Sequence, residues 1–384
     1  MNRKHKWVYR LLRRPVSLFL KLKFGYRYQL AKDLPEQYIV LSNHATDYDP
    51  ILVGVSFPKQ MYFVASEHIT RWGLAYQFLK WGFEPIIRHK GTIAASTVMD
   101  VLRKVRKGGS VCMFAEGGRT WDGETLPIHP STAKLIKASR CALVTYRLVG
   151  GYFTSPMWSS SKKTRRGPLE GAPVRVYTKE EVAAMSEEEV MEAIERDLYE
   201  DAYARQLRDP KRYRGRELAK GLEKYLFLCP ACRAHNCFET EGNTVRCGEC
   251  GLQFSYDEYG MLHEAPFDTV KDFAAWQKQE VERDVEEHAV YTASTATISA
   301  VTKQTAELLS RGELELSAQG LRCGELSFAL SEVPDLAMHG KDSLVFSANG
   351  SYYEIVCTEN AYRFWLYYTL LKQTEKTEFP EKKG

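Results

Sequence analysis

The sequence lacks any long apolar run. None of its apolar stretches approaches the roughly eighteen residues that a membrane-spanning helix needs. Its first residues also lack the continuous apolar core of about 7 to 15 residues and the small-residue cleavage site of a secretory signal. We therefore expect a cytoplasmic protein that does not cross a membrane and whose cysteines stay reduced.

Acidic residues are absent from residues 1–32, which hold ten Lys or Arg. Apolar residues accompany these charges at near-helical spacing: Trp7, Val8, Leu11, Leu12, Val16, Phe19 and Leu20. The pattern predicts that residues 1–30 form a basic amphipathic arm, which would make the protein peripheral on an anionic membrane surface. Two alternatives stay open, namely contact with a nucleic-acid backbone and a solvated helix that packs on the domain.

One histidine and one aspartate follow an apolar stretch that predicts a buried strand at residues 38–41. They are His44 and Asp49, five positions apart. On a regular helix such positions point about 140° away from each other, so the two side chains meet only at a strand-to-helix corner. Pro50 favours a helix start there. The spacing alone is a weak signal, and the alternative is Asp49 as a helix cap beside an ordinary loop histidine.

Two further segments carry residues suited to binding a ligand. Residues 82–88 predict a brief strand that ends in Arg88, and residues 110–115 predict a buried strand that runs into Glu116, Gly117, Gly118 and Arg119. Paired glycines let backbone N–H groups approach a ligand, and a guanidinium matches phosphate or carboxylate. The alternatives are a plain turn and, for Arg88, a surface ion pair.

The order of these three blocks resembles the glycerolipid (lysophospholipid) acyltransferase family. The segment from Asn43 to Pro50 is similar to its first motif, residues 82–88 to its second and residues 114–120 to its third. The resemblance covers roughly residues 30–180. It departs from the family pattern at Ala115, at Gly118 and in the strand at residues 143–146, which lacks a proline. These departures leave the identity of the acceptor open.

The resemblance implies an α/β domain with a central, mostly parallel sheet. It also implies transfer of an acyl group from acyl-CoA or acyl-carrier protein to a lysophospholipid hydroxyl, most simply that of 1-acylglycerol 3-phosphate. An imidazole can accept the hydroxyl proton at neutral pH, and a carboxylate on its other nitrogen stabilises the imidazolium. His44 is then the general base and Asp49 orients it. Arg88 and Arg119 would bind the acceptor, while Glu116, Gly117 and Gly118 shape its pocket.

Two Cys-x2-Cys pairs, separated by fourteen residues, make the most specific local signal in the chain. They are Cys229 with Cys232 and Cys247 with Cys250. Four thiolates at this spacing can surround one structural Zn²⁺ tetrahedrally, so the segment resembles a zinc ribbon. Cys237 lies outside both pairs. The ribbon has acidic as well as basic residues and no basic stripe, so we expect no nucleic-acid partner.

The remaining sequence predicts several short strands between residues 313 and 357, followed by one aromatic helix. This order resembles a pleckstrin-homology-like module; headgroup binding, partner binding and dimerisation stay open for it. We predict four parts: the arm at 1–30, an acyltransferase domain at 31–222, a zinc ribbon at 225–262 and a small β-rich domain at 285–376. The competing hypothesis is a zinc-ribbon adaptor whose acyltransferase-like domain only holds lipid.

Overall fold

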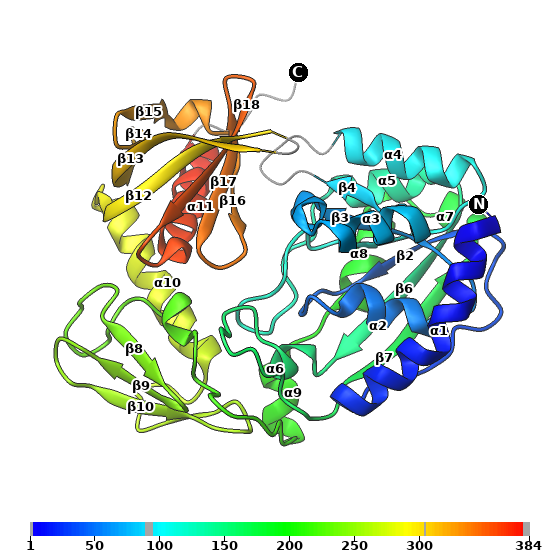
Figure 1. Ribbon diagram of the computed structural model, residues 1–384, viewed down its shortest axis with the longest axis horizontal. Helices are drawn as coiled ribbons and strands as arrows, with labels where there is room; N and C mark the ends of the chain where they lie inside the picture. The colour runs from blue at the N-terminus through cyan, green and yellow to red at the C-terminus, as the bar shows by residue number, and fades with distance from the viewer. Residues whose placement is uncertain (1–2, 89–94, 303–304, 379–384) are drawn as a thin grey trace.

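Three β-sheets organise the chain (Figure 1). The computed structural model describes residues 3–88, 95–302 and 305–378, so residues 1 and 2 of the predicted arm lie outside the described residues. Within that part, a seven-stranded sheet is followed by a four-stranded sheet and then by a second seven-stranded sheet. We call the parts around them the N-terminal unit (α1 to α9), the cysteine unit (η2 to β11) and the C-terminal unit (α10 to α11).

The sheet of the N-terminal unit has the strand order β1-β7-β6-β2-β5-β3-β4. Five of its six neighbouring pairs are parallel, and only β6 and β7 are antiparallel. Its strands are β1 (Arg27–Tyr28), β2 (Tyr38–Ser42), β3 (Tyr62–Ser66), β4 (Ile86–Arg88), β5 (Val111–Phe114), β6 (Ala142–Val149) and β7 (Glu170–Tyr177). The predicted mixed α/β architecture with a parallel-rich sheet is therefore present.

Helices cover both faces of this sheet, because its central strands are apolar on both sides. In β2, Ile39 and Leu41 pack toward one layer of helices, whereas Tyr38 and Val40 pack toward the other. The first layer contains α4 (Ala95–Arg106), α5 (Ser131–Ser139), α7 (Lys179–Ala184) and α8 (Glu187–Leu198); the second contains α1 (Arg3–Phe24) and α2 (Asp49–Ser56). The predicted capping boxes, Thr178 with Glu181 and Ser186 with Glu189, open α7 and α8.

The basic arm is a helix that packs on the domain with one face. The hydroxyl of Tyr9 donates to the carbonyl of Phe57 at 2.7 Å, and Arg13 Nε donates to the carbonyl of Val55 at 2.9 Å. The opposite face leaves Trp7, Leu11, Leu18, Phe19 and Leu22 exposed. No helix of the described residues is both long enough and apolar enough to cross a membrane.

Shorter elements complete the N-terminal unit. They are η1 (Glu67–Arg71), α3 (Leu74–Gly82), α6 (Gly151–Thr154) and α9 (Ala202–Arg208). Helical structure breaks after α9, and before β8 only the short η2 (Leu222–Lys224) follows. In the basic loop after Trp158, Arg165 is buried against the rings of Trp158 and Tyr256.

The second half of the chain is antiparallel throughout its described sheets. The cysteine unit has strands β8 (Phe238–Glu241), β9 (Thr244–Cys247), β10 (Gln253–Tyr256) and β11 (Leu262–His263). The C-terminal unit begins with α10 (Val270–Glu286) and ends with α11 (Ala361–Glu378). Between them lie β12 (Tyr291–Val301), β13 (Ala306–Ser317), β14 (Gly320–Cys323), β15 (Leu326–Ala329), η3 (Leu330–Glu332), β16 (Leu336–His339), β17 (Ser343–Ala348) and β18 (Ser351–Cys357).

Candidate active site and candidate metal centre

The first and third sequence blocks meet because they follow neighbouring parallel strands. In the ladder between β2 and β5, Ser42 is paired with Phe114, so both strands end at the same edge of the sheet. His44 comes two residues after β2, and Glu116 two residues after β5. Residues that lie far apart in the sequence are therefore brought together at the carboxyl edge of the sheet, where open α/β sheets bind ligands.

The two residues of the first block form the contact that their spacing predicts. His44 Nδ1 lies 2.8 Å from Asp49 Oδ2, and the Asp49 side chain is fully buried. The same oxygen accepts the backbone N–H groups of Ala45 at 2.6 Å and Thr46 at 2.8 Å. The Thr46 hydroxyl donates to Asp49 Oδ1 at 2.5 Å. Asp49 thus closes the corner between β2 and α2 and holds the imidazole with the same carboxylate.

The helix-cap alternative does not describe this corner. Tyr48 stands at the cap position of α2 without a side-chain bond to the helix, while Asp49 is the first helical residue and its carboxylate points back to the turn. His263 and Asp268 have the same spacing, but His263 Nε2 pairs with Asp257 Oδ2 at 2.8 Å instead. The five-residue spacing of His263 and Asp268 is therefore a chance match to that of His44 and Asp49 and does not pair their side chains.

The third block holds the backbone of His44 from both sides. The N–H of His44 donates to Glu116 Oε1 at 2.6 Å, and the N–H of Thr120 donates to the His44 carbonyl at 3.1 Å. The ring of Phe114 stacks on the imidazole with centroids 4.2 Å apart and planes tilted by 22°. Stacking on one face and a carboxylate at Nδ1 leave the ring little freedom to rotate. The imidazole is therefore preorganised for a reaction at its other nitrogen.

Glu116 connects this backbone clamp to the following loop. Its second oxygen, Oε2, accepts the N–H of Leu126 at 2.6 Å. Burial raises the pKa of Glu116 to about 8, although the hydrogen bonds from Leu126 and His44 act in the opposite direction. Glu116 is thus a positioning group for the loop in the described structure, rather than a charge that faces solvent.

Both candidate arginines lie at the loop of the third block. Arg88 Nη1 donates to the carbonyl of Gly117 at 3.4 Å, and Arg119 Nη1 pairs with Asp47 Oδ2 at 2.9 Å. Gly117 has a φ of +72°, and a Cβ at this position would lie 2.9 Å from Arg88 Nη1. A glycine at position 117 therefore allows both the left-handed turn and the close approach of the guanidinium. A Cβ at Gly118 would have its nearest neighbour, Leu126, at 3.8 Å.

Two residues without a predicted individual role also fix the site. Asn43 donates its amide to the Leu148 carbonyl and accepts the Leu148 N–H, both at 2.8 Å, which ties the histidine loop to β6. Trp121 is buried, stacks on Tyr225 with centroids 5.4 Å apart and packs at a tilt against Tyr362 with centroids 4.8 Å apart. A buried Asn next to the histidine was a detectable signal, whereas the partners of Trp121 lie about 100 or more residues away in the sequence.

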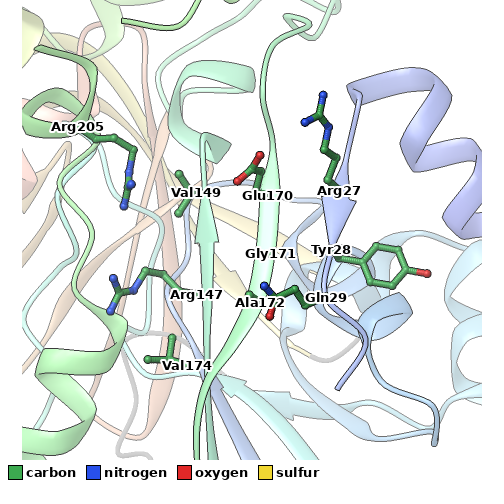
Figure 2. Close-up of a pocket in the computed structure, with 10 residues that line it drawn as sticks. All are labelled: Arg27, Tyr28, Gln29, Arg147, Val149, Glu170, Gly171, Ala172, Val174 and Arg205. Carbon is green, nitrogen blue, oxygen red and sulfur yellow. The ribbon is translucent and has the colours of Figure 1, made fainter. Parts of the chain in front are cut away.

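Two cavities lie near this edge of the sheet. A small one of about 10 Å³ is lined by residues that include His44, Glu116 and Thr120. A larger one of about 420 Å³ lies over β1, β6 and β7 and contains none of the candidate residues. Figure 2 shows Arg147 and Arg205 on one side of the larger cavity, Arg27 on the other side and Glu170 between them. Arg205 is already paired with Glu200 through two hydrogen bonds of 2.6 Å.

The four predicted thiols lie together in the cysteine unit. Among the described residues they form the one group of side chains that could hold a metal ion, with all four sulfurs within 4.8 Å of one another. Cys229 Sγ is 3.7 Å from Cys250 Sγ, and Cys232 Sγ is 3.8 Å from Cys247 Sγ. A tetrahedral site with Zn–S bonds of about 2.3 Å requires S···S distances of about 3.8 Å, so the residues fit such an ion.

The backbone of the two cysteine pairs repeats the same turn. The N–H of Arg233 donates to the Cys229 carbonyl at 2.9 Å, and the N–H of Gly251 donates to the Cys247 carbonyl at 3.1 Å. Both donors occupy the fourth position after the first cysteine and both have positive φ, +63° and +77°. Cys237 is not part of the cluster, and its thiol donates to the Ala234 carbonyl at 3.2 Å.

The first of these sites lies in a segment that is similar to known proteins. Residues 26–149 match a protein-family model described as Acyltransferase, a segment that carries His44, Asp49, Arg88 and Arg119. Among solved structures, the chain is similar to the 1-acyl-sn-glycerophosphate (LPA) acyltransferase PlsC from Thermotoga maritima. The similarity has 16% identity and a TM-score of 0.43, and it covers 54% of this chain and 85% of that chain. A score at this level does not establish a shared fold. No curated protein matches the chain.

Proposed function

We propose, from the match of residues 26–149 to the Acyltransferase family model, that the protein transfers a fatty acyl group from a thioester to a lysophospholipid hydroxyl. The most direct acceptor is 1-acylglycerol 3-phosphate, and the donor is acyl-CoA or acyl-carrier protein. The observation that supports the proposal best is the imidazole of His44, which a buried carboxylate and a stacked ring hold at the carboxyl edge of the sheet.

The proposed reaction is a direct transfer without a covalent enzyme intermediate. The acceptor oxygen attacks the thioester carbonyl carbon, a C–O bond forms and the C–S bond breaks. His44 Nε2 removes the hydroxyl proton and then gives it to the departing thiolate, so that the products are an ester and a free thiol. Asp49 accepts the Nδ1 proton of the imidazole in a hydrogen bond and stabilises the positive charge while the ring is protonated.

The acceptor would bind at the loop of the third block. Arg88 and Arg119 supply two guanidinium groups there, one above Gly117 and one beside the exposed Asp47. A phosphate monoester is the acceptor group that matches two planar cations best. The backbone at Gly117 and Gly118 lies next to the histidine loop, where the charge on the attacked carbonyl oxygen develops, so we assign these residues to the same pocket.

The activity can be tested with a histidine variant and a matched control. Purified protein, His44→Ala and His263→Ala would be assayed with lysophosphatidate and labelled acyl-CoA. We expect His44→Ala to lose at least about 10²-fold in kcat, the typical contribution of a general base, and His263→Ala to match the wild type. His263 is a suitable control because it is also bonded to a carboxylate at 2.8 Å, but lies in the cysteine unit.

Other outcomes of this assay distinguish the alternatives. Equal turnover by wild type and His44→Ala would remove His44 from the mechanism. No turnover by the wild type with either CoA or carrier-protein thioesters would favour the alternative function, a zinc-ribbon adaptor whose acyltransferase-like domain holds lipid. A lipid profile of cells that lack the protein would then identify the lipid class on which it acts.

We further propose that the four cysteines hold one structural Zn²⁺ and that the cysteine unit is a zinc ribbon. Its small sheet is joined to α10 by ring contacts, with Phe238 edge-on and Phe254 tilted to Phe273 at centroid distances of 6.0 and 5.9 Å. Metal analysis should find one zinc per chain, and Cys232→Ser should lose it, whereas Cys237→Ser should keep it. Retention of zinc by Cys232→Ser would contradict the assignment.

The expected peripheral membrane location has a surface to support it. Helix α1 contacts α3, and α3 together with the turn before it carries further exposed apolar side chains, namely Trp72, Leu74, Phe78 and Trp81. Lys4 of α1 lies over the Trp81 ring at 5.0 Å, which links the two helices. We propose that this surface lies in the interface of an anionic membrane, with the basic residues of α1 near the headgroups.

Vesicle binding tests this location. Leu11→Glu should reduce sedimentation with phosphatidylglycerol-containing vesicles, whereas Leu207→Glu should not, although both leucines are more than half exposed. Binding should also weaken as the salt concentration rises. Equal binding by both variants would exclude α1 as the contact.

The C-terminal unit is compatible with the pleckstrin-homology-like module that the sequence suggests. Its seven antiparallel strands run in the order β15-β14-β13-β12-β18-β17-β16, and a single long helix follows the last strand. We propose this relationship for its fold alone, and the next section argues a role for the unit from its contacts.

A further inference from the structure

The β16–β17 hairpin of the C-terminal unit contacts the N-terminal unit. Figure 1 shows β16, β17 and β18 on the side of the C-terminal sheet that faces the acyltransferase sheet. His339 Nε2 at the end of β16 lies 2.9 Å from His68 Nδ1, and the hydroxyl of Tyr352 donates to Glu67 Oε1 at 2.9 Å. Arg71 pairs with Glu354 at 3.2 Å. One polar contact from β16 and two from β18 therefore fix this side of the C-terminal sheet against η1.

The same unit also holds the loop that follows Arg119. Trp121, two residues further on, packs against Tyr362 of α11, and both rings are buried in one core that extends from Ala45 to the C-terminal unit. A core of this kind does not form between units that move independently. The position of Arg119 thus depends on a part of the chain that lies outside the acyltransferase match.

Lys341, in the turn of the hairpin, lies where the C-terminal unit contacts the N-terminal unit. Its Nζ donates to the carbonyl of Ser159 in the N-terminal unit, and it lies within electrostatic range of Arg119 and Asp47. Burial lowers the pKa of Lys341, and the charge of Arg119 lowers it further. Asp335, at the start of the same hairpin, lies within range of Arg88. Both candidate arginines therefore have charged neighbours in the C-terminal unit.

This grouping of cations is costly without an anion. Arg119 and Lys341 repel each other in a partly buried region. The two carboxylates within range of Lys341 compensate only in part, because Asp342 is paired with Lys224 and both side chains are largely exposed, Asp342 to 55% and Asp47 to 76%. A phosphate between the two cations would remove the repulsion and would gain charge-assisted hydrogen bonds. One N–H group of Lys341 is used by Ser159, and an ammonium has three.

We propose that the C-terminal unit forms one wall of the acceptor pocket and that Lys341 binds the phosphate of the acceptor together with Arg88 and Arg119. The inference rests on the proposed function, because it assigns the headgroup specificity of the same site. It gives the C-terminal unit a part in substrate selection that a tethered membrane or protein-binding module would not have.

The experiment compares two acceptors that differ only in the phosphate. Initial rates would be measured with lysophosphatidate and with the corresponding 1-monoacylglycerol, using the full chain and acyl-CoA. We expect Lys341→Met to raise KM for lysophosphatidate about tenfold, with kcat and the KM for monoacylglycerol nearly unchanged. Lys341→Arg should restore most of the loss, because it retains the charge.

A neighbouring lysine supplies the matched control. Lys224 pairs with Asp342 at 2.7 Å and thus clamps the same turn from outside the pocket. Lys224→Met should leave both KM values unchanged. A rise in KM for lysophosphatidate in Lys224→Met, or an equal rise for both acceptors in Lys341→Met, would show that Lys341 only fixes the hairpin and would overturn the proposal.

A binding measurement separates this inference from the proposed activity. Glycerol 3-phosphate would be titrated into wild type, Lys341→Met and Lys224→Met, and the shift in Tm would be followed. Stabilisation that is lost only in Lys341→Met supports the phosphate site even if neither acceptor is acylated, in which case the proposed function fails alone. If the wild type is active but Lys341→Met binds glycerol 3-phosphate and has a KM for lysophosphatidate like the wild type, the inference about Lys341 is refuted and the proposed function stands.

Discussion

The most informative perturbation of the candidate active site is Asp49→Asn, because it removes a charge and keeps the shape. The carboxylate is completely buried and accepts four hydrogen bonds. An asparagine amide oxygen in the place of Oδ2 can accept the bonds from His44, Ala45 and Thr46. The amide NH₂ can donate to the Thr46 hydroxyl, which is able to reverse its role. The corner between β2 and α2 should therefore keep its conformation.

The loss should be much larger for catalysis than for stability. An imidazolium and a carboxylate about 4 Å apart attract each other by about 4 kcal/mol at an effective dielectric constant of about 20. If most of this stabilises the protonated ring during transfer, kcat should fall about 10³-fold. Hydrogen bonds to the neutral amide are weaker than those to the carboxylate, so the free energy of unfolding should fall by about 1 to 3 kcal/mol.

The assay is the initial rate of acyl transfer to lysophosphatidate, with urea unfolding followed on the same samples. Asp257→Asn is the matched control, because Asp257 also accepts a histidine nitrogen at 2.8 Å and two backbone N–H groups. It should keep full activity. A kcat of Asp49→Asn within about threefold of wild type would refute the argument that the buried charge stabilises a protonated His44.

Two further predictions concern the third block. Gly117→Ala should displace Arg88 and raise KM for lysophosphatidate, because it adds a Cβ at positive φ 2.9 Å from the guanidinium. Gly118→Ala should raise KM less, because its Cβ would have its nearest neighbour, Leu126, at 3.8 Å. Equal effects would refute the geometric distinction. Glu116 has a pKa of about 8 in the folded chain, above its ordinary value of 4.5, so the stability that its protonated form contributes is fully present below about pH 4.5 and is lost as the pH rises through about 8. In urea unfolding, the free energy of unfolding of the wild type should fall relative to that of Glu116→Gln between pH 5 and 8, by up to about 1.4 kcal/mol per pH unit. Identical pH profiles of the two proteins would exclude a titration of Glu116 in this range.

Local sequence patterns were sufficient for the framework of the site. The apolar run before His44, the proline after Asp49 and the capping boxes of α7 and α8 each specify an element within a few residues of themselves. The resemblance of the block order to a known family then implied an α/β domain, and the structure unites the first and third blocks at one edge of a parallel-rich sheet. The cluster of four cysteines could equally be predicted from their local spacing, and their sulfurs do lie together.

Long-range contacts could not be predicted in the same way. Nothing near Phe114 indicates that its ring stacks on His44, since a single aromatic residue at the end of a strand has many equivalent partners. β7 is antiparallel to β6 within an otherwise parallel order, and this direction depends on the loop between them rather than on either strand. Lys341 has no periodic or motif signal, and only the folded hairpin brings it to Ser159.

The departures of the third block from the family pattern acquire a physical meaning in this context. A Cβ at position 118 would have its nearest neighbour, Leu126, at 3.8 Å, so the loop has room for a side chain there. The loop is restrained by other contacts, because Trp121 packs against Tyr225 and Tyr362 and Glu116 bonds to Leu126. Part of this restraint is supplied by the units that follow. A substitution that weakens the contact between Trp121 and Tyr362 should therefore displace Arg119 more than His44. The position of His44 is held independently, by the bonds of Asn43 to β6 and by the buried Asp49.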